Sequence, residues 1–164
     1  MRFDRVARHL LALVQRNSRR SLDQLAHAVG SSRSAVQRRM ELFRRTGVIK
    51  RDVALVDRRL VSRMETFIIH LELRCERRHL LDQFRAIVDD LPQVQQCYVT
   101  TGRLNCVAVV LLPNADELDA FVVEHFSDSP FVRRYRTRLV TRELKASLAV
   151  PVLSRDEGSQ RPSR

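Results

Sequence analysis

The stretch SLDQLAHAVGSSRSAVQRRMELFRRTGVI, residues 21–49, decides how the N-terminal part of this chain folds. Ser21 and Gln24 have the spacing of a capping box, which predicts that a helix begins there. Gly30 predicts its end, because glycine readily takes the left-handed conformation that a sharp turn between helices requires. A second helix is expected to follow and to end at Gly47. Two short helices joined by a tight turn predict a helix-turn-helix.

The second helix of this motif is predicted to have two different faces. Either Ser31 or Ser32 is expected to cap it. Val36, Met40 and Phe43 recur at helical spacing, so they should pack against neighbouring helices. The opposite face is polar and basic, and therefore is free to contact a partner.

The positive charge of the chain is concentrated around this motif. The net charge is +11, with 28 Arg and 2 Lys among the cations. Residues 1–63 contain 16 Arg or Lys and 5 Asp or Glu, whereas residues 64–164 contain 14 of each. A field concentrated in this way attracts a polyphosphate, and the alternative is a solvated basic surface without a partner.

The motif and the charge together predict binding to double-stranded DNA. Side chains near the N-terminal end of a recognition helix reach base edges, whereas more distant cations hold phosphates. We therefore expect base contacts from Arg33, Ser34, Gln37 and Arg38, with Ser32 beside them. We expect phosphate contacts from Arg39, Arg44, Arg45, Lys50 and Arg51.

The flanking segments complete a predicted domain over residues 1–56. Apolar residues at helical spacing predict an amphipathic helix that ends near Arg16. Residues 48–56 alternate in polarity, which predicts a short β wing. Residues 57–63 are then expected to form a linker.

The pattern changes to strands at residue 64, where a second domain over residues 64–153 is predicted. Strands are expected at residues 67–74, 94–101, 104–112 and 132–141, with a tight connection at Gly102 and Arg103. Helices are expected near residues 80–91 and after Asn114. The order β-α-β-β-α-β predicts a ferredoxin-like domain, so the fold class is α+β, with an N-terminal winged helix-turn-helix.

The end of the chain and the open face of the sheet carry further expectations. Residues 148–153 could add a short strand, on this subunit or a neighbouring one, and residues 154–164 are expected to be disordered. Four arginines fall on one side of the last strand: Arg134, Arg136, Arg138 and Arg142. We expect them to pair with acids such as Glu72 or to line an interface between subunits.

Several motifs resemble the Lrp/AsnC family, the leucine-responsive and asparagine-responsive regulators. They are L-A-x-x-V-G at residues 25–30, Arg39, R-x-G-V-I at residues 45–49, Thr101 with Gly102, and P-x-V-x-x-Y-x-T at residues 130–137. The resemblance covers roughly residues 3–153. It implies a DNA-binding transcription regulator that dimerises through its C-terminal domain and assembles into tetramers or octamers.

The resemblance also implies an effector, often an amino acid, bound between dimers. Its candidate contacts are Thr101, Gly102, Arg103, Leu104 and Asn105. The family usually has G-D-Y-D in this loop, so the acidic residues and the aromatic residue are replaced here, and Arg103 reverses the local charge. An amino acid, a different and anionic ligand, or no ligand are alternatives that the sequence leaves open.

An enzyme is a second class to weigh. Some relatives of the family look like haem-pathway decarboxylases that use histidines in the same loop, but residues 96–105 contain no histidine. The five histidines are scattered, without a nucleophile or an acid-base pair. The three cysteines have no CxxC spacing, so we expect reduced, mostly buried thiols and no metal site or cofactor. We therefore predict no catalysis.

Two further alternatives concern binding. RNA binding through the sheet would need aromatic side chains on the central strands, and residues 104–112 contain none. A subunit that uses a vestigial helix-turn-helix only for assembly remains open. Apolar runs too short to cross a bilayer, and an N-terminus without a signal-peptide core, predict a cytoplasmic, nucleoid-associated protein without a membrane partner.

Overall fold

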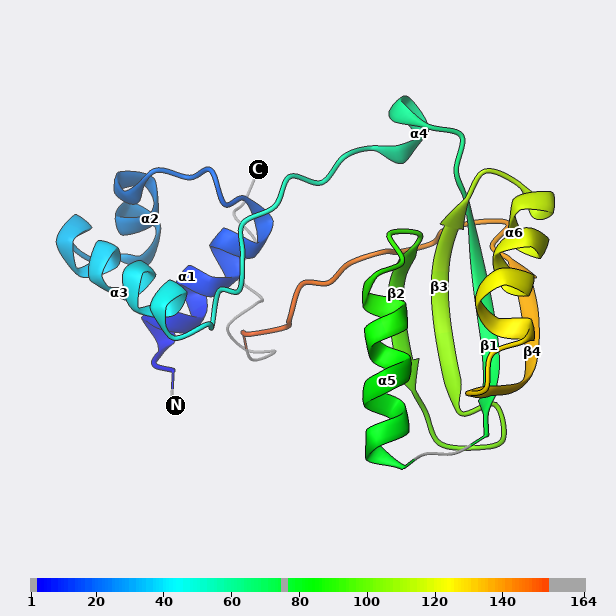
Figure 1. Ribbon diagram of the computed structural model, residues 1–164. Coiled ribbons are helices and arrows are strands. Elements are labelled where there is room, and N and C mark those ends of the chain that lie inside the picture. Colours follow the sequence, from blue (N-terminus) through cyan, green and yellow to red (C-terminus); the bar gives the residue numbers. More distant parts are fainter. Residues whose placement is uncertain (1–2, 75–76, 154–164) are drawn as a thin grey trace. The chain divides into compact units, whose positions relative to one another are not determined.

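The computed structural model describes residues 3–74 and 77–153, which form two compact units. The first unit contains residues 3–55 together with residues 145–153 from the other end of the chain. The second unit is Val56–Leu144 (Figure 1). The first unit therefore is built from two distant parts of the sequence.

The first unit begins with three helices, α1 (Arg5–Arg16), α2 (Leu22–Val29) and α3 (Arg33–Arg45). Asp4 caps α1 by accepting a hydrogen bond of 2.7 Å from the backbone N–H of Ala7. This cap was not predicted from the sequence.

The predicted turn between α2 and α3 is confirmed in detail. Ser21 accepts from the Gln24 N–H at 3.2 Å, and the Gln24 side chain accepts from the Ser21 N–H at 3.0 Å, so the capping box is complete. Gly30 ends α2 with φ at 63°, in the left-handed region. Of the two candidate caps for α3, Ser32 is the one used, accepting from the Ala35 N–H at 3.3 Å.

A single apolar core holds the three helices together. Its buried members are Ala7, Leu10, Leu11, Leu13, Leu25, Ala26, Val36, Met40 and Phe43. Phe3 packs edge-on against Phe43, with ring centroids 6.0 Å apart. The apolar positions of the predicted amphipathic faces thus meet in one place, as expected for side chains at helical spacing.

The C-terminal segment joins this same unit instead of forming the strand expected at residues 148–153. The Gln15 side-chain amide donates to the carbonyl of Val150 at 3.1 Å and its oxygen accepts from the Val150 N–H at 2.6 Å. Val152 packs against the helical core. A side-chain amide satisfies the backbone here, so no strand partner is needed. The tail expected to be disordered, residues 154–164, lies outside the described residues.

The β wing predicted at residues 48–56 is wrong for the single chain. No strand lies in this segment, which runs in extended form to the short helix α4 (Arg58–Val61), where a linker was expected. Leu55 is 95% exposed and Val53 is 59% exposed. Alternation alone does not make a strand, because a strand also needs a neighbour that completes its backbone hydrogen bonds.

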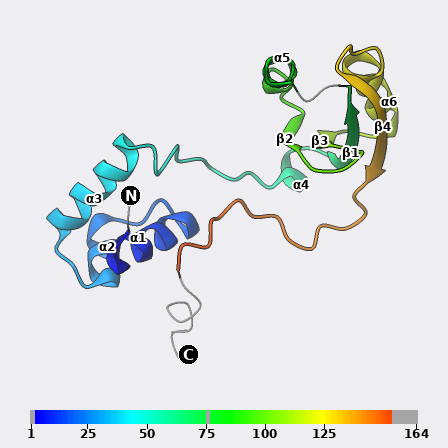
Figure 2. The same cartoon turned by 90° about the horizontal axis from the view of Figure 1, so that it is seen from below.

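The second unit has the predicted β-α-β-β-α-β order. Its elements are β1 (Glu65–Leu73), α5 (Arg78–Asp89), β2 (Val94–Val99), β3 (Cys106–Leu112), α6 (Ala115–Val122) with the π-helical turn η1 (Val123–Ser127), and β4 (Val132–Leu139). The strands form one antiparallel sheet in the order β2-β3-β1-β4. Figure 2 shows α5 and α6 on the same side of this sheet. The unit is therefore ferredoxin-like.

The period of two along β1 assigns its side chains to the two faces of the sheet. Phe67, Ile69 and Leu71 are buried under the helices. Ile68 and His70, on the other face, are only partly buried. The predicted cap of α6 is confirmed, since the Asn114 side chain accepts from the Glu117 N–H at 2.9 Å.

The connection between β2 and β3 is longer than the tight turn expected at Gly102 and Arg103. The strands stop at residues 99 and 106, leaving a six-residue loop over residues 100–105. The Thr100 N–H donates to the Asn105 carbonyl at 2.8 Å and closes this loop.

Within the described residues, no helix is both long and apolar enough to cross a membrane.

Candidate DNA-binding surface and effector loop

The polar face of α3 and the segment after it present the residues predicted to bind DNA. Val36, Met40 and Phe43 are buried, so α3 is fixed with its opposite side outward. The exposed members of the predicted set are Ser32, Arg33, Ser34, Gln37, Arg38, Arg44, Arg45, Lys50 and Arg51. We call these nine residues the basic face.

Part of the basic face is engaged in weak contacts within the unit. The Gln37 amide donates to the Glu41 carboxylate at 3.0 Å, and Arg33 lies 3.5 Å from Asp23. Exposed pairs of this kind contribute about 0–1 kcal/mol, so a phosphate or base edge can replace them at little cost.

The remaining cations of the basic face are available for a partner. Arg38, Arg45, Lys50 and Arg51 are exposed, and the described part of the chain contains no ion-pair or hydrogen-bond partner for their side chains. Arg44 lies 3.4 Å from Asp52. The exposed contacts predicted on α3 thus share the side of the helix opposite its buried residues, and Lys50 and Arg51 follow the helix in the chain.

Arg39 departs from the predicted pattern. Its guanidinium donates two hydrogen bonds to the carboxylate of Asp4, at 2.9 and 2.7 Å. This bidentate pair joins α3 to the first turn of α1, and together with the Ala7 N–H it lowers the pKa of Asp4. The structure gives Arg39 a partner within the fold, whereas a phosphate contact was predicted for it from the sequence.

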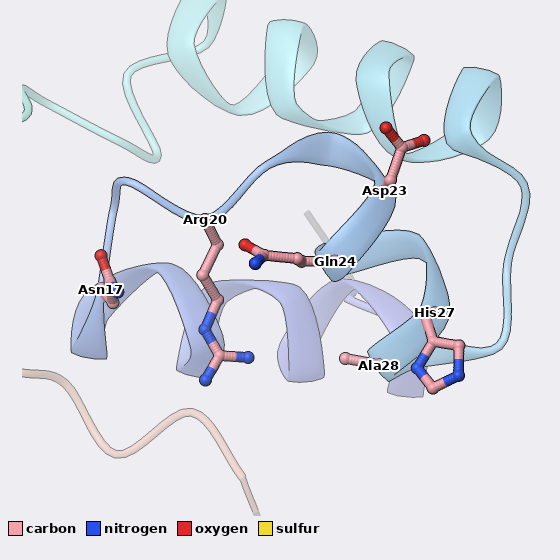
Figure 3. A pocket seen from close by; sticks show the side chains of 6 residues that line it. All are labelled: Asn17, Arg20, Asp23, Gln24, His27 and Ala28. Carbon is pink, nitrogen blue, oxygen red and sulfur yellow. The ribbon is translucent and has the colours of Figure 1, made fainter.

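A shallow hollow of about 700 Å³ lies beside α2 and was not predicted from the sequence (Figure 3). It is lined by Asn17, Arg20, Asp23, Gln24, His27 and Ala28. Five of its six lining residues have polar side chains, and the hollow is open to solvent. Asp23 connects it to the basic face, because the same carboxylate pairs with Arg33.

The predicted effector residues occupy the loop over residues 100–105, at one end of the sheet. Thr101, Gly102 and Arg103 are exposed, whereas Asn105 is buried. Gly102 has φ at 105°, a conformation that disfavours any side chain. The Asn105 side-chain oxygen accepts a hydrogen bond of 2.7 Å from the Leu73 N–H, which anchors the loop to β1.

The charge of this loop is balanced by an acid that lies far away in the sequence. Glu72 is only 8% exposed, and its carboxylate lies 3.7 Å from Arg103 and 3.3 Å from Arg133. Glu72 offsets one of these two cations, so the three side chains together keep the single positive charge that Arg103 alone predicted. Among the arginines of the last strand, Arg134 lies directly opposite Glu72 and was one of those expected to pair with it. The ion pairs found for Glu72 in the described residues are instead with Arg133 and Arg103.

The face of the sheet opposite the helices combines apolar and basic side chains. Ile68, Val107 and Val109 are partly exposed at its centre. Arg134, Arg136 and Arg138 lie along β4, opposite Glu72, His70 and Ile68 on β1. Such a face suits contact with another protein surface.

The histidines give no catalytic arrangement in the part of the chain that the structure describes. His125 packs on Phe121 with ring centroids 4.7 Å apart, and the others lie on separate elements. No group of three or more His, Cys, Asp or Glu side chains among residues 3–74 and 77–153 is placed to hold a metal ion.

A helix-turn-helix unit with an exposed basic face, joined to a ferredoxin-like unit, defines a two-domain DNA-binding transcription regulator. Comparison with known proteins makes the assignment specific. Residues 3–43 match the AsnC-type helix-turn-helix domain, and residues 66–150 match the Lrp/AsnC ligand binding domain. The chain belongs to the Lrp/AsnC family.

Individual relatives agree with this assignment. The HTH-type transcriptional regulator y4tD of Sinorhizobium fredii is 32% identical over 93% of this chain and 90% of its own length. An AsnC family transcriptional regulator from Agrobacterium tumefaciens has a similar structure, with a TM-score of 0.83, 25% identity, and coverage of 92% of this chain and 97% of that one. The transcriptional regulator NMB0573 of Neisseria meningitidis, solved as a complex with L-Met, has the same TM-score and coverage at 21% identity.

Proposed function

We propose that the protein is a homo-oligomeric regulator that reads an operator by placing α3 in the major groove of DNA. The observation that carries this proposal is the basic face, where nine predicted contacts are exposed and four cations have no partner within the described residues. Arg33, Gln37 and Arg38 are the base readers, and Lys50 with Arg51 holds phosphates. The guanidinium and amide groups match guanine and adenine edges respectively.

Self-assembly is the second part of the proposal. One short helix contacts too few base pairs for operator-level specificity, so the unit works in pairs. The open face of the sheet, apolar at Ile68, Val107 and Val109, supplies the contact between subunits. A two-fold dimer then requires a roughly palindromic operator, with half-sites about one helical turn or a multiple of it apart. Dimers associate further into tetramers or octamers.

We assign the loop over residues 100–105 to effector binding. The L-Met complex of the Neisseria regulator supports an amino acid as the first ligand to test. Arg103 would bind the carboxylate of the amino acid. The buried carboxylate of Glu72, 3.7 Å from Arg103, would attract its ammonium group. A purely anionic ligand stays an alternative, because Arg103 and Arg133 both pair with Glu72 and the three side chains together keep one net positive charge.

We further propose that the chain has no catalytic activity and acts through DNA alone. Its relatives are named as transcriptional regulators, and its histidines lie on separate elements. A protein whose target is chromosomal DNA works in the cytoplasm, at the nucleoid.

The test measures binding to genomic fragments recovered by footprinting and to random duplex, over a series of salt concentrations. Gln37→Ala and Arg38→Ala should each weaken operator binding by about 1–3 kcal/mol at one base-pair position and leave random duplex little affected. Lys50→Ala should weaken binding to both duplexes equally. It should also reduce the slope of log affinity against log salt concentration by about 1 per subunit.

Arg78→Ala is the matched control, because it removes an exposed arginine of the second unit, outside the basic face. It should leave both affinities unchanged. Failure of the intact protein to retard any duplex at low salt would refute the regulator proposal. Equal losses on operator and random duplex for Gln37→Ala would refute its assignment as a base reader.

A further inference from the structure

Two cysteines meet at the base of the loop over residues 100–105. Cys97 on β2 and Cys106 on β3 have their sulfur atoms 3.5 Å apart. In the strand register, Cys97 lies opposite Ala108 and Cys106 lies opposite Val99. The two cysteines are therefore diagonal neighbours on the helix-covered face of the sheet, and both are free thiols.

The two thiols differ in access to solvent. Cys97 is partly exposed and lines a hollow of about 510 Å³, together with residues of α5 such as Phe84, Arg85 and Asp89. Cys106 is fully buried behind it. A small molecule that enters the hollow reaches Cys97 first, so Cys97 is suited to react and Cys106 to follow.

The hydrogen bond between the sulfurs favours the same division of roles. When Cys97 is ionised, only the Cys106 thiol can donate to the other sulfur, and this hydrogen bond lowers the pKa of Cys97 despite partial burial and the nearby Asp89 carboxylate. The same hydrogen bond and burial raise the pKa of Cys106. A thiolate is the reactive form of cysteine, so the first attack belongs to Cys97.

We propose that Cys97 and Cys106 are a site of oxidative modification, at which a hydroperoxide converts the two thiols into a reversible disulfide. The Cys97 thiolate attacks one peroxide oxygen, the O–O bond breaks, and the alcohol or water leaves after taking a proton. Cys97 is then a sulfenic acid. Cys106 gives up its proton and attacks the Cys97 sulfur; the S–S bond forms as the S–O bond breaks, and water leaves. Two electrons pass from the thiols to the peroxide, and a dithiol reverses the reaction.

Closure of this bridge draws the sulfur atoms of β2 and β3 together. A disulfide needs its sulfurs at about 2.05 Å, so the pair has to approach from 3.5 Å. β2 is at the edge of the sheet and pairs only with β3 among the described strands, so β2 is the element that can shift. The shift reaches the loop over residues 100–105, which joins these strands. Its effect on an effector rests on the function proposed above for that loop.

The chain offers a direct assay for the bridge. Trypsin cleaves after Arg85, Arg103 and Arg133, which places Cys97 in peptide 86–103 and Cys106 in peptide 104–133. The full chain is treated with a stoichiometric amount of hydrogen peroxide, its free thiols are alkylated, and it is digested without reduction. We expect the two peptides as one linked species lighter by two hydrogens than their sum, loss of two of the three thiols per chain, and recovery of both after dithiothreitol.

Matched variants separate this pair from other thiol chemistry. Cys75→Ala should still form the linked peptides, whereas Cys97→Ala should leave Cys106 reduced and alkylated. Cys106→Ala should stop at the sulfenic acid on Cys97, which dimedone traps. Unlinked, alkylated peptides 86–103 and 104–133 after peroxide, or linkage of either one only to Cys75 or to another subunit, would overturn the proposal.

Hydrogen exchange tests the consequence for the loop. In the Cys75→Ala variant, oxidation should weaken the hydrogen bond from the Thr100 N–H to the Asn105 carbonyl and speed exchange of that amide. In the double variant Cys75→Ala/Cys97→Ala, peroxide should leave this exchange rate unchanged. A mapped disulfide with unchanged Thr100 exchange would refute the coupling to the loop. Neither readout uses DNA, so failure of DNA binding would refute the proposed function and leave the disulfide standing.

Discussion

At the residue scale, Asn105 shows how a loop residue can be structural. Its side-chain oxygen is buried and accepts the Leu73 N–H at 2.7 Å. Asn105→Ala should leave a buried donor without its acceptor and lower the free energy of unfolding by about 1–3 kcal/mol. Urea unfolding measures this loss. Thr101→Ala, at an exposed position of the same loop, should change stability by no more than about 0.5 kcal/mol. Equal effects of the two substitutions would contradict the anchoring role of Asn105.

The Asp4–Arg39 pair gives a pH dependence with a defined sign. The pKa of Asp4 is lowered below its ordinary value of 3.8, first by the hydrogen bonds from Arg39. The stabilisation is therefore present above about 3.8 and is lost as pH falls through the lower, folded-state pKa. Asp4→Asn removes this charge pair but keeps a residue that caps helices well.

We accordingly expect Asp4→Asn to lower the thermal midpoint at about pH 7, and this deficit to shrink at about pH 2 as the Asp4 carboxylate of the parent chain takes up a proton. Thermal unfolding at the two pH values measures this difference. A deficit of the same size at both would show that the cap, not the ion pair with Arg39, is what the substitution removes.

At the scale of single elements, α3 depends on its first residues. The Ser32 hydroxyl accepts from the Ala35 N–H, and Ser31 has no such role among the described residues. Ser32→Ala should cost about 0.5–2 kcal/mol and lower operator affinity, because the start of α3 frays. Ser31→Ala is the control and should remain close to the parent chain in chemical unfolding and in DNA titration. A larger loss for Ser31→Ala would mean that the cap is wrongly assigned.

Elements with a strong local pattern were predicted well from the sequence. The capping box and the terminal Gly30 of α2 and the period of two in β1 are local properties, and all three are found in the structure. The prediction of a β wing at residues 48–56 was wrong because alternating polarity does not supply the partner strand that a β-strand needs. The loop over residues 100–105 was predicted at the right place but with too few residues. The hydrogen bond from the Thr100 N–H to the Asn105 carbonyl closes it, and this closure follows no recognisable turn motif.

At the scale of the whole molecule, the C-terminal segment completes the DNA-binding unit. Gln15 makes two hydrogen bonds with the backbone of Val150, and Val152 covers the helical core. Gln15→Ala should weaken this attachment by about 1 kcal/mol. Trypsin cleavage after Lys145 should then become faster, while Arg16→Ala, at the next position of α1, should leave that rate unchanged. An unaltered cleavage rate in Gln15→Ala would show that the segment is held by other contacts.

The candidate site was predicted in part. The residues of the basic face follow from helical spacing, because the positions of Val36, Met40 and Phe43 leave the opposite side free. The pairing of Arg39 with Asp4, and of Arg103 with Glu72, joins residues about thirty positions apart and depends on how helices and strands pack. No local pattern carries this information.

The sequence by itself determined the helix-turn-helix, the order of helices and strands along the second unit and the surplus of charge in the first half, because periodicity, capping and composition are read along the chain. Only the tertiary structure decided which charges are balanced, where the C-terminal segment lies, and that Cys97 meets Cys106. These features depend on distances between residues remote in sequence, which are set by side-chain packing in the two cores.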